Sequence, residues 1–237
     1  MLNSQATEPS ETVPVQETHW EMAAKTRMGE YLTKVETDFI TKSVDFSKTE
    51  MVLDVGAESG RVSLFALGTK TSVVSIDIDL VSLRRLKQRT KHAAIVAADA
   101  RKLPFKDGVF DAEFWIEVLD YIPEFEEALN ECKRTLKPRS PSVLSFGNQS
   151  SFKAKIKGLK GKSYLHSYRN AVQSLLKTGF IVKAQLGYNW LPFGRISQNP
   201  IVPVLAWLEW VFGLRKIKRY SPWVMIHAVK PESKQQD

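Results

Sequence analysis

Short apolar runs alternate along the chain with longer stretches in which apolar residues recur every three or four positions. The short runs are typical of buried strands, and the longer stretches are typical of amphipathic helices. Strands are expected at residues 51–55, 72–76, 94–98, 110–116, 142–146, 180–188 and 223–230. Helices are expected at residues 19–44, 61–67, 80–89, 124–136 and 167–177.

This alternation predicts an α/β fold, a doubly wound sheet that is mostly parallel, with helices on both faces. The last two strands are expected to complete the sheet as an antiparallel pair. In such sheets, ligands bind beyond the carboxyl ends of the strands. Candidate site residues should therefore be sought where the predicted strands end.

The pattern also divides the chain. Residues 1–18 are polar and are expected to form a flexible tail. Residues 19–237 are expected to form a single domain, with an N-terminal helix at 19–44, a ligand-binding core at 50–147 and a C-terminal substrate or lid region at 148–230. The apolar run at 201–214 contains Pro203 and Glu209 and is shorter than the ~20 residues that a membrane-spanning helix needs. A cytoplasmic protein is expected, with peripheral contact to a membrane as an alternative.

Composition narrows the chemistry only a little. Cys132 is the single cysteine, which excludes a disulfide within the chain and is typical of a reducing compartment. The four histidines lie far apart in sequence, so no metal site is expected. The formal charge of +8 is compatible with an anionic partner or with a solvated surface.

The first chemical signal is the run Val52-Leu-Asp-Val-Gly-Ala-Glu-Ser-Gly-Arg61. A buried strand leads into a turn whose glycines let the backbone approach a ligand, and a helix follows. About twenty residues later the next strand ends at Asp77, whose carboxylate can accept both hydroxyls of a ribose. A further acid, Asp99, ends the third strand. Together the three features indicate a site for a nucleoside or a dinucleotide.

These motifs resemble the class I S-adenosylmethionine-dependent methyltransferases, a family with a Rossmann-like fold, and among them the branch of ubiquinone and menaquinone methyltransferases. The resemblance covers roughly residues 50–147. Besides the glycine turn and Asp77, it rests on three runs: Ala98-Asp-Ala-Arg-Lys-Leu-Pro-Phe105, Phe110-Asp-Ala-Glu-Phe-Trp-Ile-Glu-Val-Leu-Asp-Tyr-Ile122 and Arg134-Thr-Leu-Lys-Pro138.

The resemblance implies S-adenosylmethionine as the cofactor and assigns residues to it. Those at the glycine turn would surround its methionine part: Asp54, Gly56, Ala57 and Gly60. Those at the next two strand ends would hold its adenosine: Asp77 and Ile78, then Asp99 and Ala100. Trp115 would line the pocket floor beside the sulfonium.

The chain departs from the family at two places. Glu58 stands where the family usually has a second glycine, and Arg139-Ser140 stands where it usually has two glycines. Glu58 adds bulk and negative charge near the amino-acid end of the cofactor. A non-catalytic, methyltransferase-like binding protein is therefore kept as one alternative.

Methyl transfer to a hydroxyl or an acidic carbon benefits from a general base. Three residues beyond the predicted fourth strand are candidates for this role: Glu117, Asp120 and His166.

The acceptor is expected to be a small molecule, lipid-like or quinone-like, amphiphilic or anionic. Two segments suggest this: the lysine-rich run at 153–162, and the run at 190–214 with its Trp and Phe residues, which the basic residues 215–219 follow. A nucleic-acid or protein methyltransferase that docks through these lysines is a second alternative, although no RNA-binding module is visible. The oligomeric state stays open.

Overall fold

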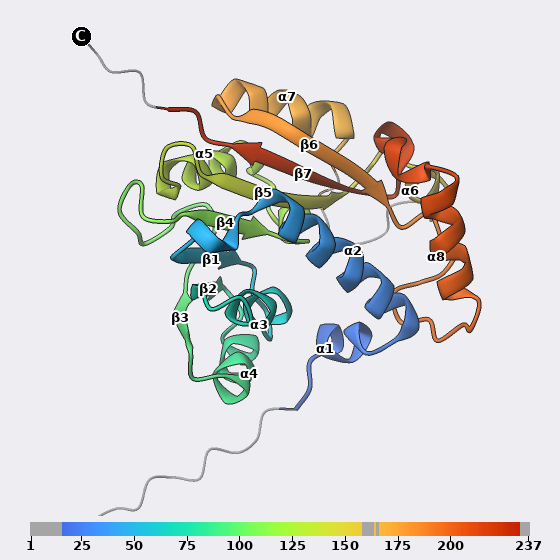
Figure 1. Ribbon diagram of the computed structural model, residues 1–237, viewed down its shortest axis with the longest axis horizontal. Helices are drawn as coiled ribbons and strands as arrows, with labels where there is room; N and C mark the ends of the chain where they lie inside the picture. Colours follow the sequence, from blue (N-terminus) through green and yellow to red (C-terminus); the bar gives the residue numbers. More distant parts are fainter. Residues whose placement is uncertain (1–15, 158–163, 165, 233–237) are drawn as a thin grey trace, which may run out of the picture.

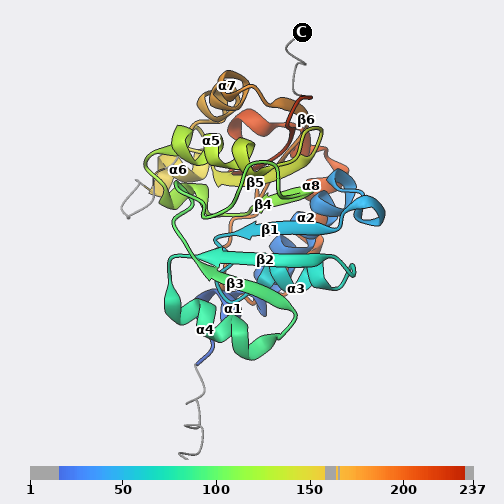
Figure 2. The same ribbon diagram turned by 90° about the vertical axis from the view of Figure 1, so that its left-hand side faces the viewer.

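The core of the protein is a seven-stranded sheet with the strand order β3-β2-β1-β4-β5-β7-β6. The computed structural model describes residues 16–157, 164 and 166–232. Figure 2 shows the strands stacked in this order, from β3 near the bottom to β6 near the top. The strands are β1 Met51–Val55, β2 Ser72–Asp77, β3 Ala93–Ala97, β4 Ala112–Trp115, β5 Pro141–Gly147, β6 Ile181–Tyr188 and β7 Trp223–Val229.

The pairing confirms the predicted fold class. Strands β1 to β5 pair in parallel, and β7 runs antiparallel to both β5 and β6. Gly147 at the end of β5 faces Trp223 at the start of β7, and Tyr188 at the end of β6 faces the same tryptophan. The start of β7 therefore lies at the edge of the sheet where the parallel strands end.

Helices cover both faces of the sheet (Figures 1 and 2). One apolar core joins the sheet to α5 and α7, and a second joins it to α2, α3 and α8. Helix α4 packs on β2 and β3. The helices are α1 His19–Ala24, α2 Arg27–Ser43, α3 Arg61–Leu67, α4 Leu80–Arg89, α5 Phe125–Thr135, α6 Phe152–Lys157, α7 Tyr168–Thr178 and α8 Val202–Val211.

The N-terminal helix is two helices, so the prediction of one helix over 19–44 was wrong. Thr26 has an extended backbone and caps α2 by accepting from the N–H of Gly29. A Cβ at Gly29 would lie 1.9 Å from the carbonyl oxygen of Ala23. Helix α1 therefore folds back onto the first turn of α2 at a spacing that only glycine permits.

Other boundaries differ from the prediction by one or two residues. Strand β4 is shorter than expected, because Phe110 is tied to Leu136 in an isolated bridge outside the strand. The predicted tail at 1–18 lies mostly outside the described residues, as do residues 158–162 of the lysine-rich run. Among the described residues, no helix is long and apolar enough to cross a membrane.

Candidate cofactor and acceptor site

The glycine turn lies at the carboxyl edge of the sheet, bound to the end of β2. The N–H of Ala57 donates to the carbonyl of Ile76 over 2.9 Å. The N–H of Glu58 donates to Oδ2 of Asp77, also over 2.9 Å. The turn and the predicted ribose acid are thus held side by side by their own hydrogen bonds.

Two glycines of this turn have no room for a side chain. Gly56 and Gly60 have φ of +70° and +92°, in the left-handed region that favours glycine. A Cβ at Gly56 would lie 2.6 Å from Val118, and one at Gly60 would lie 2.2 Å from Leu86. The turn is therefore packed tightly between the segment after β4 and helix α4.

Asp54 supports the turn from inside the sheet. Its carboxylate is buried and accepts a 2.5 Å hydrogen bond from Ser63 of α3. Burial raises the pKa of Asp54 to about 7. The visible role of Asp54 is to join β1 to α3, and its contact with a cofactor stays a prediction.

The adenosine end of the predicted site is open to solvent. Ile78 follows Asp77 and is 74% exposed, which is unusual for a large aliphatic side chain. Asp99 is exposed at the end of β3 and is paired with Arg101, whose hydrogen bonds lower the pKa of the Asp99 carboxyl. Ala100 is buried beside it. An exposed apolar side chain next to a carboxylate is suited to a purine base and a ribose.

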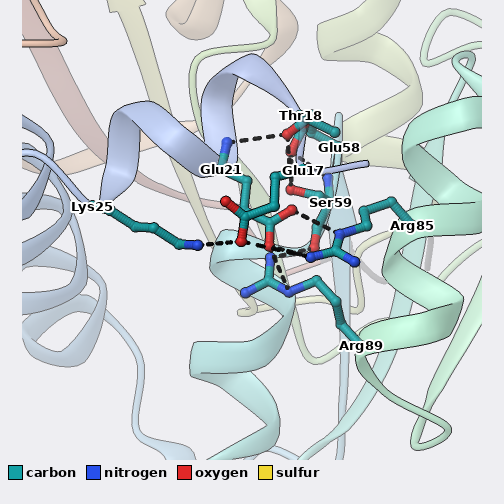
Figure 3. A network of polar contacts seen from close by, with 8 residues as sticks. All are labelled: Glu17, Thr18, Glu21, Lys25, Glu58, Ser59, Arg85 and Arg89. Carbon is teal, nitrogen blue, oxygen red and sulfur yellow. Dashed lines mark hydrogen bonds and ion pairs between the residues drawn. The ribbon is translucent and has the colours of Figure 1, made fainter. Parts of the chain in front are cut away.

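Helix α1 covers the glycine turn from the N-terminal side (Figure 3). Thr18, its N-cap, lies 3.3 Å from Ser59 between the two hydroxyl oxygens. Glu21 accepts two 2.9 Å hydrogen bonds from Arg85 of α4, and Arg89 donates to the carbonyl of Ser59 over 2.7 Å. These contacts tie α1, the turn and α4 together.

The sequence did not predict this group, because its members lie up to 71 residues apart, from Thr18 to Arg89, and each pairing depends on the fold. The one available signal was that Arg85 and Arg89 are four residues apart on one helix face.

Glu58 does not extend away from the turn. It has a φ of +50°, and its carboxylate bends back to accept from the N–H and the hydroxyl of Ser59. The left-handed conformation explains why the family usually has glycine at this position. Here the side chain caps its own turn.

Of the three candidate bases, Asp120 lies nearest the end of β5. Its carboxylate is buried and accepts from the N–H of Gly147 over 2.9 and 3.0 Å. Burial raises the pKa of Asp120 to about 7. A carboxyl group with this pKa can exchange a proton near neutral pH.

His166 lies close to Asp120 but faces α5. Its ring packs on Phe125, with 4.3 Å between the ring centroids, and bonds to the backbone of Leu119. Burial lowers its pKa, and its Nε2 has no hydrogen-bond partner among the described residues.

Glu117 is engaged in a network of buried charges. It binds Arg195, and Arg61 lies 3.7 Å away. Arg61 also binds Glu36, which is fully buried and accepts a 2.8 Å hydrogen bond from the hydroxyl of Tyr188. Two cations next to Glu117 favour its ionised form and leave it poorly suited to accept a proton. Its role as a base stays a prediction that this arrangement does not favour.

Trp115 is fully buried, and its indole N–H donates to Glu113 over 2.8 Å. It has no surface to present to a ligand in this conformation. Its visible role is packing in the core against α5 and α7.

Aromatic rings collect around Arg195 at the carboxyl edge of the sheet. The Arg195 guanidinium lies 4.9 Å from the ring centroid of Trp20 and 5.7 Å from that of Trp223. At the same edge of the sheet, Phe152 of α6 stacks on Trp190, which follows β6, with 5.8 Å between the ring centroids. This side of the site therefore carries aromatic rings beside the Arg195–Glu117 ion pair.

A family profile described as "Methyltransferase domain" matches residues 53–143, from β1 to β5. A demethylmenaquinone methyltransferase of Streptomyces avermitilis is 34% identical over 105 residues, which are 44% of this chain and 46% of that protein. The chain carries a class I S-adenosylmethionine-dependent methyltransferase domain.

A more distant sequence relative and a solved structure are also methyltransferases. The 24-methylenesterol C-methyltransferase 3 of Arabidopsis thaliana is 26% identical over 203 residues, 73% of this chain and 56% of that protein. The crystal structure of magnesium protoporphyrin IX methyltransferase from Synechocystis, with bound S-adenosylhomocysteine, has the same fold. Its TM-score is 0.63 at 14% identity, over 91% of this chain and 89% of that chain. The chain spans about a third to a little over half the length of the curated relatives that it matches.

S-adenosylmethionine is the cofactor of this domain, and the residues present fit it. Gly56 has no side chain and its φ of +70° lies in the left-handed region, which leaves the backbone of the turn uncovered by a side chain at this position. Asp77 is held at the turn, and the exposed Ile78 directly follows it. Asp77, Ile78 and Asp99 would hold the adenosine, and the turn would hold the methionine part.

Proposed function

We propose that the protein transfers a methyl group from S-adenosylmethionine to a small, lipid-like acceptor. The observation that carries the acceptor class is the group of rings at the carboxyl edge of the sheet: Trp20, Phe152, Trp190 and Trp223. Aromatic side chains bind apolar molecules well and present few groups for a polar substrate. The names of the relatives from Streptomyces avermitilis and Arabidopsis thaliana, a demethylmenaquinone and a sterol methyltransferase, support the same class.

The cofactor supplies an activated methyl group together with its own leaving group, so the protein mainly orients the reactants and excludes water. In this proposal the glycine turn and Asp77 fix the cofactor, and α1 closes over the turn through Thr18 and Glu21. The acceptor lies against the rings near Arg195.

Asp120 is the proposed general base. It is buried, accepts from one backbone N–H and has a pKa of about 7, so it can take a proton from a hydroxyl or an acidic carbon near neutral pH. Glu117 is neutralised by Arg195 and Arg61, and His166 faces α5.

The test is transfer of a radiolabelled methyl group into an organic-extractable product. A demethylmenaquinol and a 24-methylenesterol serve as acceptors, and RNA and a protein mixture serve as polar controls. We expect label in the organic phase only, and at least about a hundredfold loss of kcat in Asp120→Asn, the usual size of a general-base effect.

Two results would overturn the proposal. Label that appears only in RNA or protein would favour the macromolecular alternative. Absence of transfer with intact cofactor binding and a full panel of apolar acceptors would favour a non-catalytic binding protein. The cofactor affinity of Asp120→Asn, measured in parallel, shows whether the variant has lost the methyl-transfer step alone or has also lost cofactor binding.

A further inference from the structure

Helix α8 presents an apolar face to solvent. Trp207 and Trp210 within the helix are 58% and 64% exposed, and Phe212 directly after it is 71% exposed. Ile201, Val204 and Val211 are exposed as well. A helix on the surface of a water-soluble protein normally shows polar residues on its outer side. Figure 1 places α8 at the right-hand edge of the molecule, on the outside of α2.

The single charged residue of α8, Glu209, points inward. It is buried and accepts hydrogen bonds of 2.6 and 2.7 Å from the hydroxyl of Tyr31 in α2. It also accepts from the N–H of Trp190 over 3.0 Å and from Nε of Arg215 over 2.9 Å. These bonds fix the rotation of the helix, so its tryptophans are held outward by the fold.

Basic residues border the apolar face. The two short 3-10 turns after α8, Leu214–Lys216 and Lys218–Tyr220, carry four cations and no acidic residue within 215–220. On the other side, a groove of about 750 Å³ runs between α2 and α8. Its lining includes Trp207 and Trp210 and is richer in basic than in acidic residues: Lys25, Arg27, Lys34, Lys42 and Arg215 against Glu30 and Asp38.

We propose that this face docks on the surface of an anionic lipid bilayer. Tryptophan and phenylalanine prefer the boundary between headgroups and acyl chains, and flanking lysines and arginines are attracted to anionic headgroups. The exposed rings match the boundary between headgroups and acyl chains, and the flanking basic residues match the anionic headgroups. A protein partner would need acidic residues opposite these cations. In an anionic bilayer, the headgroup phosphates supply the negative charge.

Docking there would also bring the site to the membrane. The loop that leads from Trp190 into α8 contains Arg195, which binds Glu117 at the end of β4. The carbonyl of Ser197 in the same loop accepts from the N–H of Met28 at the start of α2. The loop thus joins the docking face to the acceptor side. The docking itself needs neither cofactor nor acceptor and does not depend on the proposed reaction.

The experiment is sedimentation of the full chain with vesicles, without cofactor. One set contains phosphatidylcholine alone, and the other contains phosphatidylcholine with phosphatidylglycerol. We expect binding to the anionic vesicles, weakened by salt, and little binding to the neutral ones.

Two variants test the face. Trp207→Ser combined with Trp210→Ser, and Lys216→Glu combined with Arg219→Glu, are each expected to weaken partitioning by about tenfold or more. The matched controls lie on α7, where Leu176 is exposed and Lys177 lies in the last turn. Leu176→Ser and Lys177→Glu should leave the partitioning onto vesicles unchanged. Circular dichroism confirms that each variant is folded.

Failure to bind anionic vesicles, or equal binding by wild type and both double variants, would overturn the proposal. Concentration-dependent self-association that the tryptophan double variant abolishes, without vesicle binding, would instead assign the face to a second copy of the chain. Asp77→Asn should keep vesicle binding, so failure of docking and failure of the methyltransferase reaction are separable.

Discussion

The two ends of the site are built in different ways. At the cofactor end, the contacts come from a glycine turn and from short acids at consecutive strand ends, with Asp77 bound to the N–H of Glu58. At the acceptor end, they come from side chains far apart in sequence, such as Glu117 with Arg195 and Glu36 with Arg61. Backbone geometry sets the first end, and buried charge pairs and rings set the second.

This difference teaches which substitutions each end tolerates. The stability of the glycine turn is sensitive to added side-chain atoms, because Gly56 is packed against Val118 and Gly60 against Leu86. The stability of the buried ion pairs at the acceptor end is sensitive to the removal of a charged group, because the loss of one partner leaves the other charge buried and unpaired.

The largest effect is expected at Glu36, which is fully buried between Arg61 and Tyr188. Glu36→Ala should lower the free energy of unfolding by about 3–5 kcal/mol, because it leaves the Arg61 cation without its buried partner. Urea unfolding measures this. Glu30→Ala, on the exposed side of the same helix, should cost little, and a loss below about 1 kcal/mol for Glu36→Ala would contradict the network.

Asp120 should give stability a pH dependence of definite sign. Its pKa is raised to about 7, so between about pH 4 and pH 7 the folded protein keeps a proton that the unfolded chain releases. Stability contributed by this group therefore falls as pH rises through that range, by at most about 1.4 kcal/mol per pH unit.

Asp120→Asn removes the titration, so its unfolding free energy relative to wild type should rise from pH 4 to pH 7, by up to about 4 kcal/mol. Asp38→Asn, on the exposed side of α2, is the control and should track wild type. Parallel pH profiles for wild type and Asp120→Asn would show that the carboxyl group is not perturbed.

At the cofactor end, Gly56→Ala should cost about 2–3 kcal/mol of stability, from the clash with Val118 and the positive φ. Adding Val118→Ala should relieve the clash and recover part of this loss. Gly194→Ala is the matched control, because a Cβ there would meet nothing within 4 Å. Equal thermal midpoints for the two single variants would contradict the packed turn.

The smallest effect is expected at Glu58, although the family usually has glycine there. Its carboxylate is turned onto Ser59, so Glu58→Gly should change the affinity for S-adenosylhomocysteine by less than about 1 kcal/mol. Calorimetry measures this. Binding more than about tenfold tighter in the variant would show that Glu58 obstructs the cofactor.

The same contrast explains what the sequence could predict. Strands, the glycine turn and Asp77 follow from local spacing and periodicity, and the sheet confirms the fold class and the positions of all seven predicted strands, whereas helices α6 and α8 were not predicted. The break between α1 and α2 was missed because it depends on a tertiary contact, Gly29 against Ala23.

The acceptor end was predicted less well for the same reason. Glu117 was proposed as a base from its place after a strand, but its pairing with Arg195 spans 78 residues and no local pattern reveals it. The rings of 190–214 were recognised as apolar. Which of them face the site and which face solvent depends on how Glu209 fixes α8.

The central claim is that the strand ends around Asp77 bind S-adenosylmethionine. The most direct test is calorimetry with S-adenosylhomocysteine on wild type, on Asp77→Asn and on Asp79→Asn, whose side chain only caps α4. We expect the wild type to bind, Asp77→Asn to weaken this binding by about 1–3 kcal/mol through the loss of charged hydrogen bonds, and Asp79→Asn to leave it nearly unchanged. Absence of wild-type binding, or equal losses in both variants, would contradict this claim.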